Sequence, residues 1–132
     1  MRRPFFLAFC LLAAGLAAAG VKPALLQTDS GSRLLVLWRG QSGGVRFVNS
    51  VTGQPVAIDF RIGRLFQNFS VATDATTEAY YTHGVYPMSA ALAAESTRTL
   101  RFCSSTGIEL RLGFYHVHLQ DGCLEARLLW TL

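Results

Sequence analysis

The chain has 132 residues, of which 51% are hydrophobic and 15% charged, with a formal net charge of +4 at pH 7. That length suits one domain with a modest core. Its 12 lysines and arginines are scattered along the sequence and form no basic stripe, which argues against a protein that binds nucleic acid.

The N-terminal segment has the layout of a secretory signal peptide. Arg2 and Arg3 form a positive start, residues 5–16 are an unbroken apolar or small run, and alanines occupy the −3 and −1 positions of a cleavage site after Ala19. We predict that residues 1–19 are removed, which lowers the formal charge to +2 and leaves no stable membrane insertion. The protein is then expected in the periplasm or outside the cell.

An uncleaved anchor is the alternative interpretation of this segment. The apolar stretch of residues 5–21 is 17 residues long, which is the short limit of a membrane span.

Cleavage also changes how the cysteines are interpreted. Of the three cysteines, Cys10 leaves with the signal peptide, so Cys103 and Cys123 remain. An even pair in an oxidising compartment predicts one structural disulfide. Closing a loop of this length stabilises a domain by roughly 3 kcal/mol on the chain-entropy model.

The rest of the chain has the pattern of short strands and turns. Residues 20–32 are interpreted as a leader, and residues 33–132 as the folded domain. The clearest alternation falls on residues 56–62, where apolar side chains occupy every second position. Residues 109–119 are expected to form one strand, and Asp121-Gly122 carries a hairpin signal before the closing strand. Together these segments predict an all-β fold, a single small antiparallel β-sandwich of about 7–8 strands.

His116 and His118 are the sharpest local feature. Residues at i and i+2 of a strand point the same way, so these imidazoles can bind a copper or zinc ion, with His83 or Met88 completing the site. In the alternative interpretation the two histidines continue an apolar row and leave the core near the strand end. That row consists of Leu110, Leu112 and Phe114.

The sequence carries no recognisable catalytic motif. Its acidic residues are dispersed, and no Gly-x-Ser-x-Gly elbow occurs. We therefore predict no catalytic residues and no cofactor, with a small secreted hydrolase as an alternative. Trp38 is a candidate for contact with a protein partner. Four tyrosines are candidates for contact with a polysaccharide, namely Tyr80, Tyr81, Tyr86 and Tyr115.

One stretch of the chain is similar to a known family. A strand Val45-Arg46-Phe47-Val48-Asn49 is followed by a turn, the alternating strand 56–60, a spacer and then Gly84-Val85-Tyr86. This order, between Gly44 and Glu95, resembles the periplasmic accessory protein family of the bacterial alginate O-acetylation machinery. Members of that family are longer and contain two such domains. The resemblance does not extend to the pair Cys103 and Cys123 or to His116 and His118.

The resemblance implies a non-catalytic role in exopolysaccharide O-acetylation. It implies partners in the cell envelope, where the protein would bridge a membrane acyl-transfer protein and a periplasmic acetyltransferase. The matched positions are structural in character, so no functional residue is carried over.

Overall fold

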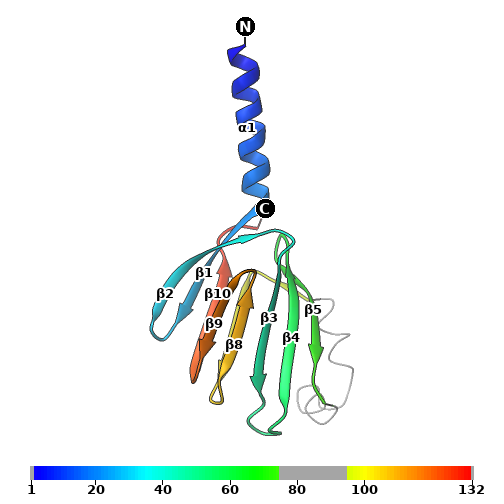
Figure 1. Cartoon of the computed structure of the whole chain (residues 1–132), viewed down its shortest axis with the longest axis vertical. Coiled ribbons are helices and arrows are strands. Elements are labelled where there is room, and N and C mark those ends of the chain that lie inside the picture. The colour runs from blue at the N-terminus through cyan, green and yellow to red at the C-terminus, as the bar shows by residue number, and fades with distance from the viewer. Residues whose placement is uncertain (1, 75–94, 132) are drawn as a thin grey trace.

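The computed structural model describes residues 2–74 and 95–131, which form one helix and ten strands (Figure 1). The elements in chain order are α1 (Arg3–Gly20), β1 (Val21–Thr28), β2 (Gly31–Trp38), β3 (Ser42–Val48), β4 (Pro55–Ile62), β5 (Phe66–Ala72), β6 (Ser96–Thr97), β7 (Thr99–Ser104), β8 (Ile108–Leu112), β9 (Tyr115–Leu119) and β10 (Gly122–Leu128).

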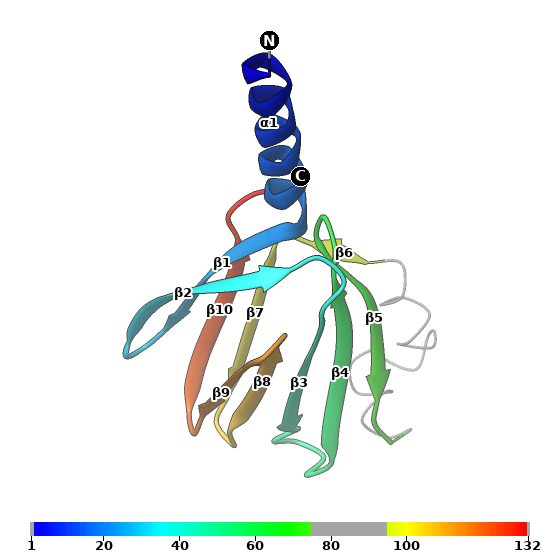
Figure 2. The same ribbon diagram turned by 45° about the horizontal axis from the view of Figure 1, so that its top comes forward.

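The strands form two antiparallel sheets that pack face to face. The four-stranded sheet has the order β2-β1-β10-β7, and the six-stranded sheet has the order β6-β5-β4-β3-β8-β9. Figure 2 shows the two layers from above, with β2 passing in front of β10 and β7 of its own sheet. The predicted all-β sandwich is therefore confirmed.

The core lies between the two sheets and follows from the alternation in each strand. In β4, Val56, Phe60 and Ile62 are buried, whereas Asp59 and Arg61 between them are exposed. The Phe60 ring lies 5.5 Å from the ring of Phe66, edge to face, which is a favourable arrangement for two aromatic rings. Such inward rows from the two sheets interdigitate to form the core of a sandwich.

The segment expected to be a leader is part of the sheet, so the prediction for residues 20–32 was wrong. β1 lies between β2 and β10, and its Ala24 and Leu26 are buried. The alternation was hidden in the sequence because the inward position before Ala24 is a lysine, Lys22, which is also fully buried.

Residues 109–119 form two strands where one was expected. A turn at Gly113 and Phe114 separates β8 from β9. Gly113 has a φ of +57°, a left-handed conformation that glycine adopts without strain, and its N–H donates a 3.0 Å hydrogen bond to the Ser42 carbonyl. The chain reverses at this turn, so the alternating pattern of β8 does not continue into β9.

The Asp121-Gly122 signal marks a turn, but not a hairpin. β9 belongs to the six-stranded sheet and β10 to the four-stranded sheet, so the chain changes sheets at this point. Gly122 has a φ of +110°, which explains why glycine is needed there whichever strand follows.

The predicted Cys103–Cys123 disulfide is present. The two cysteines lie directly opposite each other on β7 and β10, with their Cα atoms 4.0 Å apart. They share the outer face of the sheet with Arg101 and Glu125, so the bond joins the sheet surface and not the core. Cys10 is an exposed free cysteine on α1.

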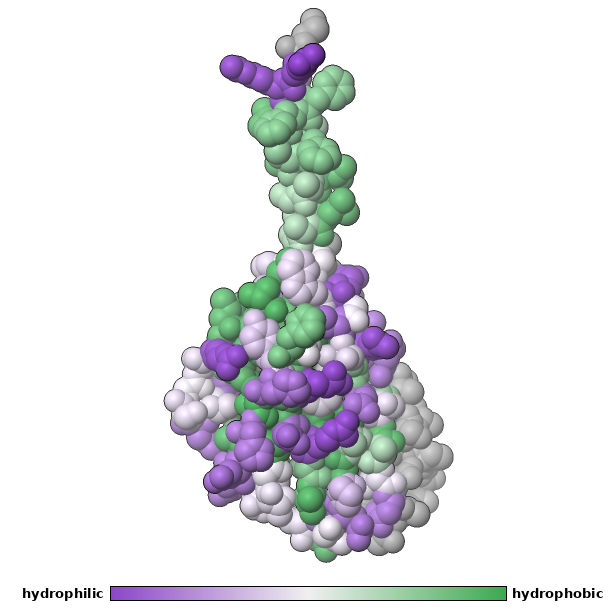
Figure 3. All heavy atoms as spheres, in the orientation of Figure 1, coloured by the Kyte–Doolittle hydropathy of each residue, from purple (hydrophilic) through white to green (hydrophobic). Residues whose placement is uncertain are grey.

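Helix α1 extends away from the sandwich as a single rod (Figure 1). Its apolar side chains face outward, with Phe5 81% and Leu11 74% exposed. Figure 3 shows a hydrophobic surface along the helix and hydrophilic residues at its tip. Within residues 2–74 and 95–131, no helix is both long enough and apolar enough to span a membrane.

Candidate functional site

The two predicted site histidines lie together on the outer face of the six-stranded sheet. His116 and His118 are exposed, and they alternate along β9 with the half-buried Tyr115, Val117 and Leu119. The interpretation that they continue the row of Leu110 and Leu112 was wrong. Because the chain reverses at Gly113, Val117 is the residue that pairs with Leu110, and the histidines face away from the core.

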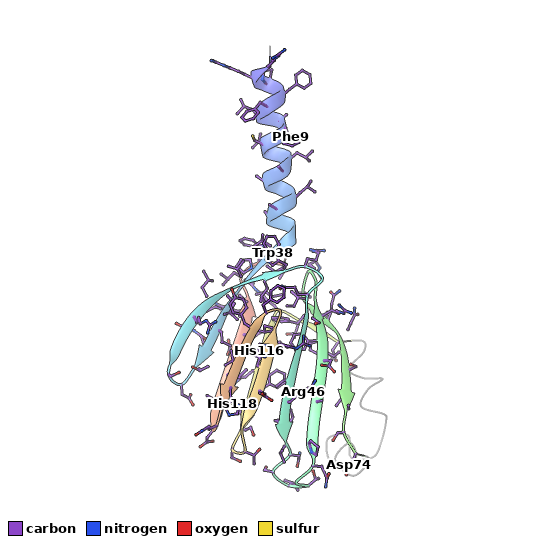
Figure 4. The ribbon with its side chains drawn as sticks, in the orientation of Figure 1. Phe9, Trp38, Arg46, Asp74, His116 and His118 are labelled. Atoms are coloured by element: carbon purple, nitrogen blue, oxygen red, sulfur yellow. A yellow bond between two sulfur atoms is a disulfide. The ribbon has the colours of Figure 1, made fainter. Side chains whose placement is uncertain are left out.

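Charged residues of β8 and β3 lie beside the histidines. Arg111 pairs across the strands with His116, and Glu109 pairs with His118. Arg46 on β3 pairs with Glu109, so Arg46, Glu109 and His118 form one row across the three strands. Figure 4 shows His116, His118 and Arg46 on this part of the sheet.

This face carries a small depression and a larger groove. A depression of about 130 Å³ is lined by Arg46, Arg111 and His116 among others. A larger groove of about 510 Å³ borders Arg46, Glu109, His118 and Asp74. The Arg111 guanidinium is anchored, since Nη1 donates a 3.0 Å hydrogen bond to Ser42 Oγ.

The metal-binding prediction rests on these two imidazoles alone. In the part of the chain that the structure describes, no group of three or more His, Cys, Asp or Glu side chains is arranged to hold a metal ion. His83 and Met88, the proposed completing ligands, lie outside the described residues.

Tyr115, one of the four tyrosines proposed to contact a polysaccharide, contacts β2. Its hydroxyl oxygen accepts a 3.2 Å hydrogen bond from the Val36 backbone N–H, and the Arg33 guanidinium lies 5.4 Å from the ring centroid. Tyr80, Tyr81 and Tyr86 lie outside the described residues.

A second candidate surface lies on the outer face of β1 and β2. Leu34, Val36 and Trp38 are 60%, 45% and 50% exposed, although large apolar side chains are normally buried. Directly across from them on β1 are the half-buried Leu25, Pro23 and Val21. We call these six residues the β1–β2 apolar face. Its sequence signal is the unbroken apolar run at residues 34–38, because a strand with one wet face normally alternates.

The open edge of β2 is covered at two positions next to this face. The N–H of Val36 is bonded to Tyr115, and the N–H of Trp38 donates a 2.9 Å hydrogen bond to Gln41 Oε1. Blocked N–H groups hinder the addition of a partner strand. The β1–β2 apolar face is therefore suited to side-chain docking.

Two segments of the family resemblance form one hairpin. Val45 on β3 pairs with Ile58 on β4. Asn49 ends the first segment and is 95% buried, and its Oδ1 accepts 2.9 Å hydrogen bonds from the N–H groups of Val51 and Thr52. These positions shape the turn. Gly84-Val85-Tyr86 lies outside the described residues.

No protein-family model matches this chain, and searches of curated proteins and of solved structures found no match.

Proposed function

We propose that this chain is an exported, non-catalytic accessory protein that binds a partner protein in a cell-envelope assembly. The observation that carries the proposal is the β1–β2 apolar face. Exposed apolar patches on a folded domain are typical of protein-binding surfaces. Here the patch contains a half-exposed tryptophan, Trp38, and aromatic anchors contribute most to many interfaces.

The surroundings of the face indicate the chemistry of the partner. Arg127 on β10 pairs with Leu25 and is exposed, so a guanidinium group borders the face. Arg33 lies on the other side of β2, in the row of Leu35 and Leu37, with its guanidinium over the ring of Tyr115. A complementary partner has an apolar centre with a carboxylate at the rim next to Arg127, because opposite charges at the rim guide association and fix the register.

The resemblance supports exopolysaccharide O-acetylation of the alginate type as the assembly. In that setting the partner is an acetyltransferase component in the periplasm. The disulfide supports a location outside the cytosol, where such bonds persist.

Affinity capture from cross-linked envelopes of the native host tests the proposal. The variant Leu34→Ser/Val36→Ser removes the centre of the face. The matched control is Val51→Ser/Phe114→Ser, which removes two apolar side chains that are 66% and 90% exposed elsewhere. We expect an acyltransferase or acetyltransferase component with the wild type and the control, and its loss with the face variant. Equal recovery with all three proteins contradicts the proposal.

Export has its own test. Intact-mass measurement of the protein from the host envelope should give a chain that begins at Gly20. An arginine in place of Ala19 should prevent this cleavage, because the −1 position accepts only a small side chain. A full-length mass for the wild type contradicts cleavage.

Copper or zinc binding is the second candidate function. It is favoured by the exposure of His116 and His118 on one face of β9. Calorimetric titration of the purified protein should show stoichiometric uptake that His116→Ala/His118→Ala abolishes. Uptake that the double variant leaves unchanged rules out this site.

A further inference from the structure

Five cationic residues from four segments gather where α1 leaves the sandwich. They are Lys22, Arg39, Arg61, Arg64 and Arg98. Backbone hydrogen bonds hold the segments together: the Arg39 N–H donates to the Gly20 carbonyl at 2.8 Å, and the Leu128 N–H to the Arg98 carbonyl at 3.0 Å. We call this end of the molecule the cationic pole.

Lys22 lies inside the pole and joins its parts. Its Nζ donates hydrogen bonds to the carbonyl oxygens of Arg64 and Trp130, at 3.1 and 2.8 Å. Burial lowers the pKa of Lys22, and the charges of Arg39, Arg64 and Arg98 lower it further.

The four arginines of the pole are exposed to solvent. Two are held by backbone carbonyls: Arg61 Nη1 donates to Gly40 at 3.4 Å, and Arg98 Nε donates to Leu128 at 2.7 Å. The segments that build the pole contain no aspartate or glutamate. These segments are residues 20–23, 38–41, 61–66, 96–99 and 128–131.

Apolar side chains accompany the arginines. Trp38 is 50% and Leu129 37% exposed, and Trp38 lies at the base of α1 (Figure 4). The Trp130 indole is fixed at the same end, because its Nε1 donates a 3.0 Å hydrogen bond to the Val21 carbonyl. Tryptophan next to cations is the composition that proteins place at the level of lipid headgroups.

We propose that the cationic pole docks peripherally on an anionic lipid surface. The arginines would pair with phosphate groups, and Trp38 and Leu129 would enter the headgroup layer. The position of α1 supports this occupant, since the apolar helix leaves the domain from the same end (Figure 1). A bilayer that receives this helix during export therefore lies next to the pole.

Docking in this way leaves the other surfaces accessible. His118 and Asp74 lie toward the opposite end of the sandwich (Figure 4). Leu34 and Val36 precede Trp38 by four and two residues on β2, so the β1–β2 apolar face and the pole share Trp38, and a partner that binds through Leu34 and Val36 leaves the arginines of the pole accessible. The proposal does not depend on the identity of that partner.

Vesicle co-sedimentation of the full chain tests the proposal. The probes are vesicles of phosphatidylcholine alone and of phosphatidylcholine mixed with phosphatidylglycerol, at low and high salt. The variant is Arg61→Gln/Arg64→Gln. The matched control, Arg46→Gln/Arg101→Gln, removes the same charge from exposed sites on β3 and β7, away from the pole. All three proteins keep α1, so any binding by the helix itself is the same in each.

We expect the wild type and the control to prefer the anionic vesicles, and the pole variant to bind them about 10- to 30-fold more weakly. The preference should weaken at high salt. The single variant Arg64→Gln keeps the Arg61–Gly40 hydrogen bond, and its affinity for anionic vesicles should fall about fivefold. This variant tests the pole even if the double variant does not fold.

Two results would overturn the proposal. One is equal binding of the wild type and the pole variants to anionic vesicles, because the pole then contributes nothing. The other is binding that depends on the pole with a soluble polyuronate but not with vesicles, which would make the pole a site for an acidic polysaccharide.

Discussion

The ammonium group of Lys22 donates a 2.8 Å hydrogen bond to the carbonyl oxygen of Trp130, a residue 108 positions later in the chain. The bond joins the first strand to the segment after the last one. Lysine is rarely fully buried, and Lys22 donates hydrogen bonds to two backbone carbonyls, those of Arg64 and Trp130. Lys22 therefore closes the sandwich at the end from which α1 emerges.

Replacement of this lysine by methionine should change the pH dependence of stability. In the folded state the pKa of Lys22 lies below its ordinary value of 10.5. Between those two values the unfolded chain holds more protons than the folded one, so the free energy of unfolding rises with pH. Urea unfolding across this alkaline range should show a smaller rise for Lys22→Met than for the wild type.

The same variant should lose about 1–3 kcal/mol at neutral pH, because two backbone carbonyls lose their donor. Arg46→Gln serves as the control, since it removes an exposed cation from β3. Identical pH profiles for the wild type and Lys22→Met would show that the buried ammonium does not titrate as described.

The disulfide should stabilise the fold without taking part in any activity. Cys103→Ser/Cys123→Ser is expected to lower the free energy of unfolding by about 3 kcal/mol, from the entropy of a loop with a sequence separation of 20. Denaturant unfolding measures this loss. Cys10→Ser should change nothing, because this cysteine is exposed on α1. A double variant with unchanged stability but lost partner binding would contradict a purely structural role.

A methyl group at Gly43 should disrupt the centre of the larger sheet. A Cβ at this position would overlap the Phe60 ring and lie 2.9 Å from the Arg111 carbonyl oxygen. Overpacking of this kind costs about 1–3 kcal/mol, so Gly43→Ala should lower the melting temperature. Gly20→Ala is the control, because its Cβ would meet nothing within 4 Å. Equal melting temperatures would mean that β3 and β4 move apart more easily than the packing indicates.

Loss of the Asn49 side chain should weaken the β3–β4 turn. Asn49→Ala leaves the N–H groups of Val51 and Thr52 without the acceptor that lies 2.9 Å from each. We expect a loss of about 1–3 kcal/mol in thermal or chemical unfolding. Gln54→Ala, at an exposed position of the same turn, should have little effect. If both variants were equally stable, solvent would be replacing the asparagine.

Several features of the fold could be predicted from local sequence patterns. The alternation in residues 56–62 identified the buried side of β4, because side chains of a strand point alternately to its two faces. With Cys10 assigned to the predicted signal peptide, two cysteines remained, and two cysteines allow one pairing. The chain order of strands and turns also sufficed for the fold class.

The site could be predicted only in part. The spacing of His116 and His118 correctly placed them on one side of a strand, but which side depended on the turn at Gly113. Of the β1–β2 apolar face, only Trp38 was predicted as a contact residue, although the apolar run at residues 34–38 also marks the face. The covering of the β2 edge by Tyr115 involves residues 79 positions apart, and no local pattern reports such a contact.

By itself the sequence determined the strand content, the cysteine pair and the apolar segment that resembles a signal peptide, because each depends on residues close together or on residue counts. Only the tertiary structure decided that residues 21–28 are an inner strand, that β9 and β10 lie in different sheets, and that scattered arginines gather at one end around Lys22. The physical reason is that strand pairing depends on hydrogen bonds and packing between distant segments, which a pattern with a period of two does not specify.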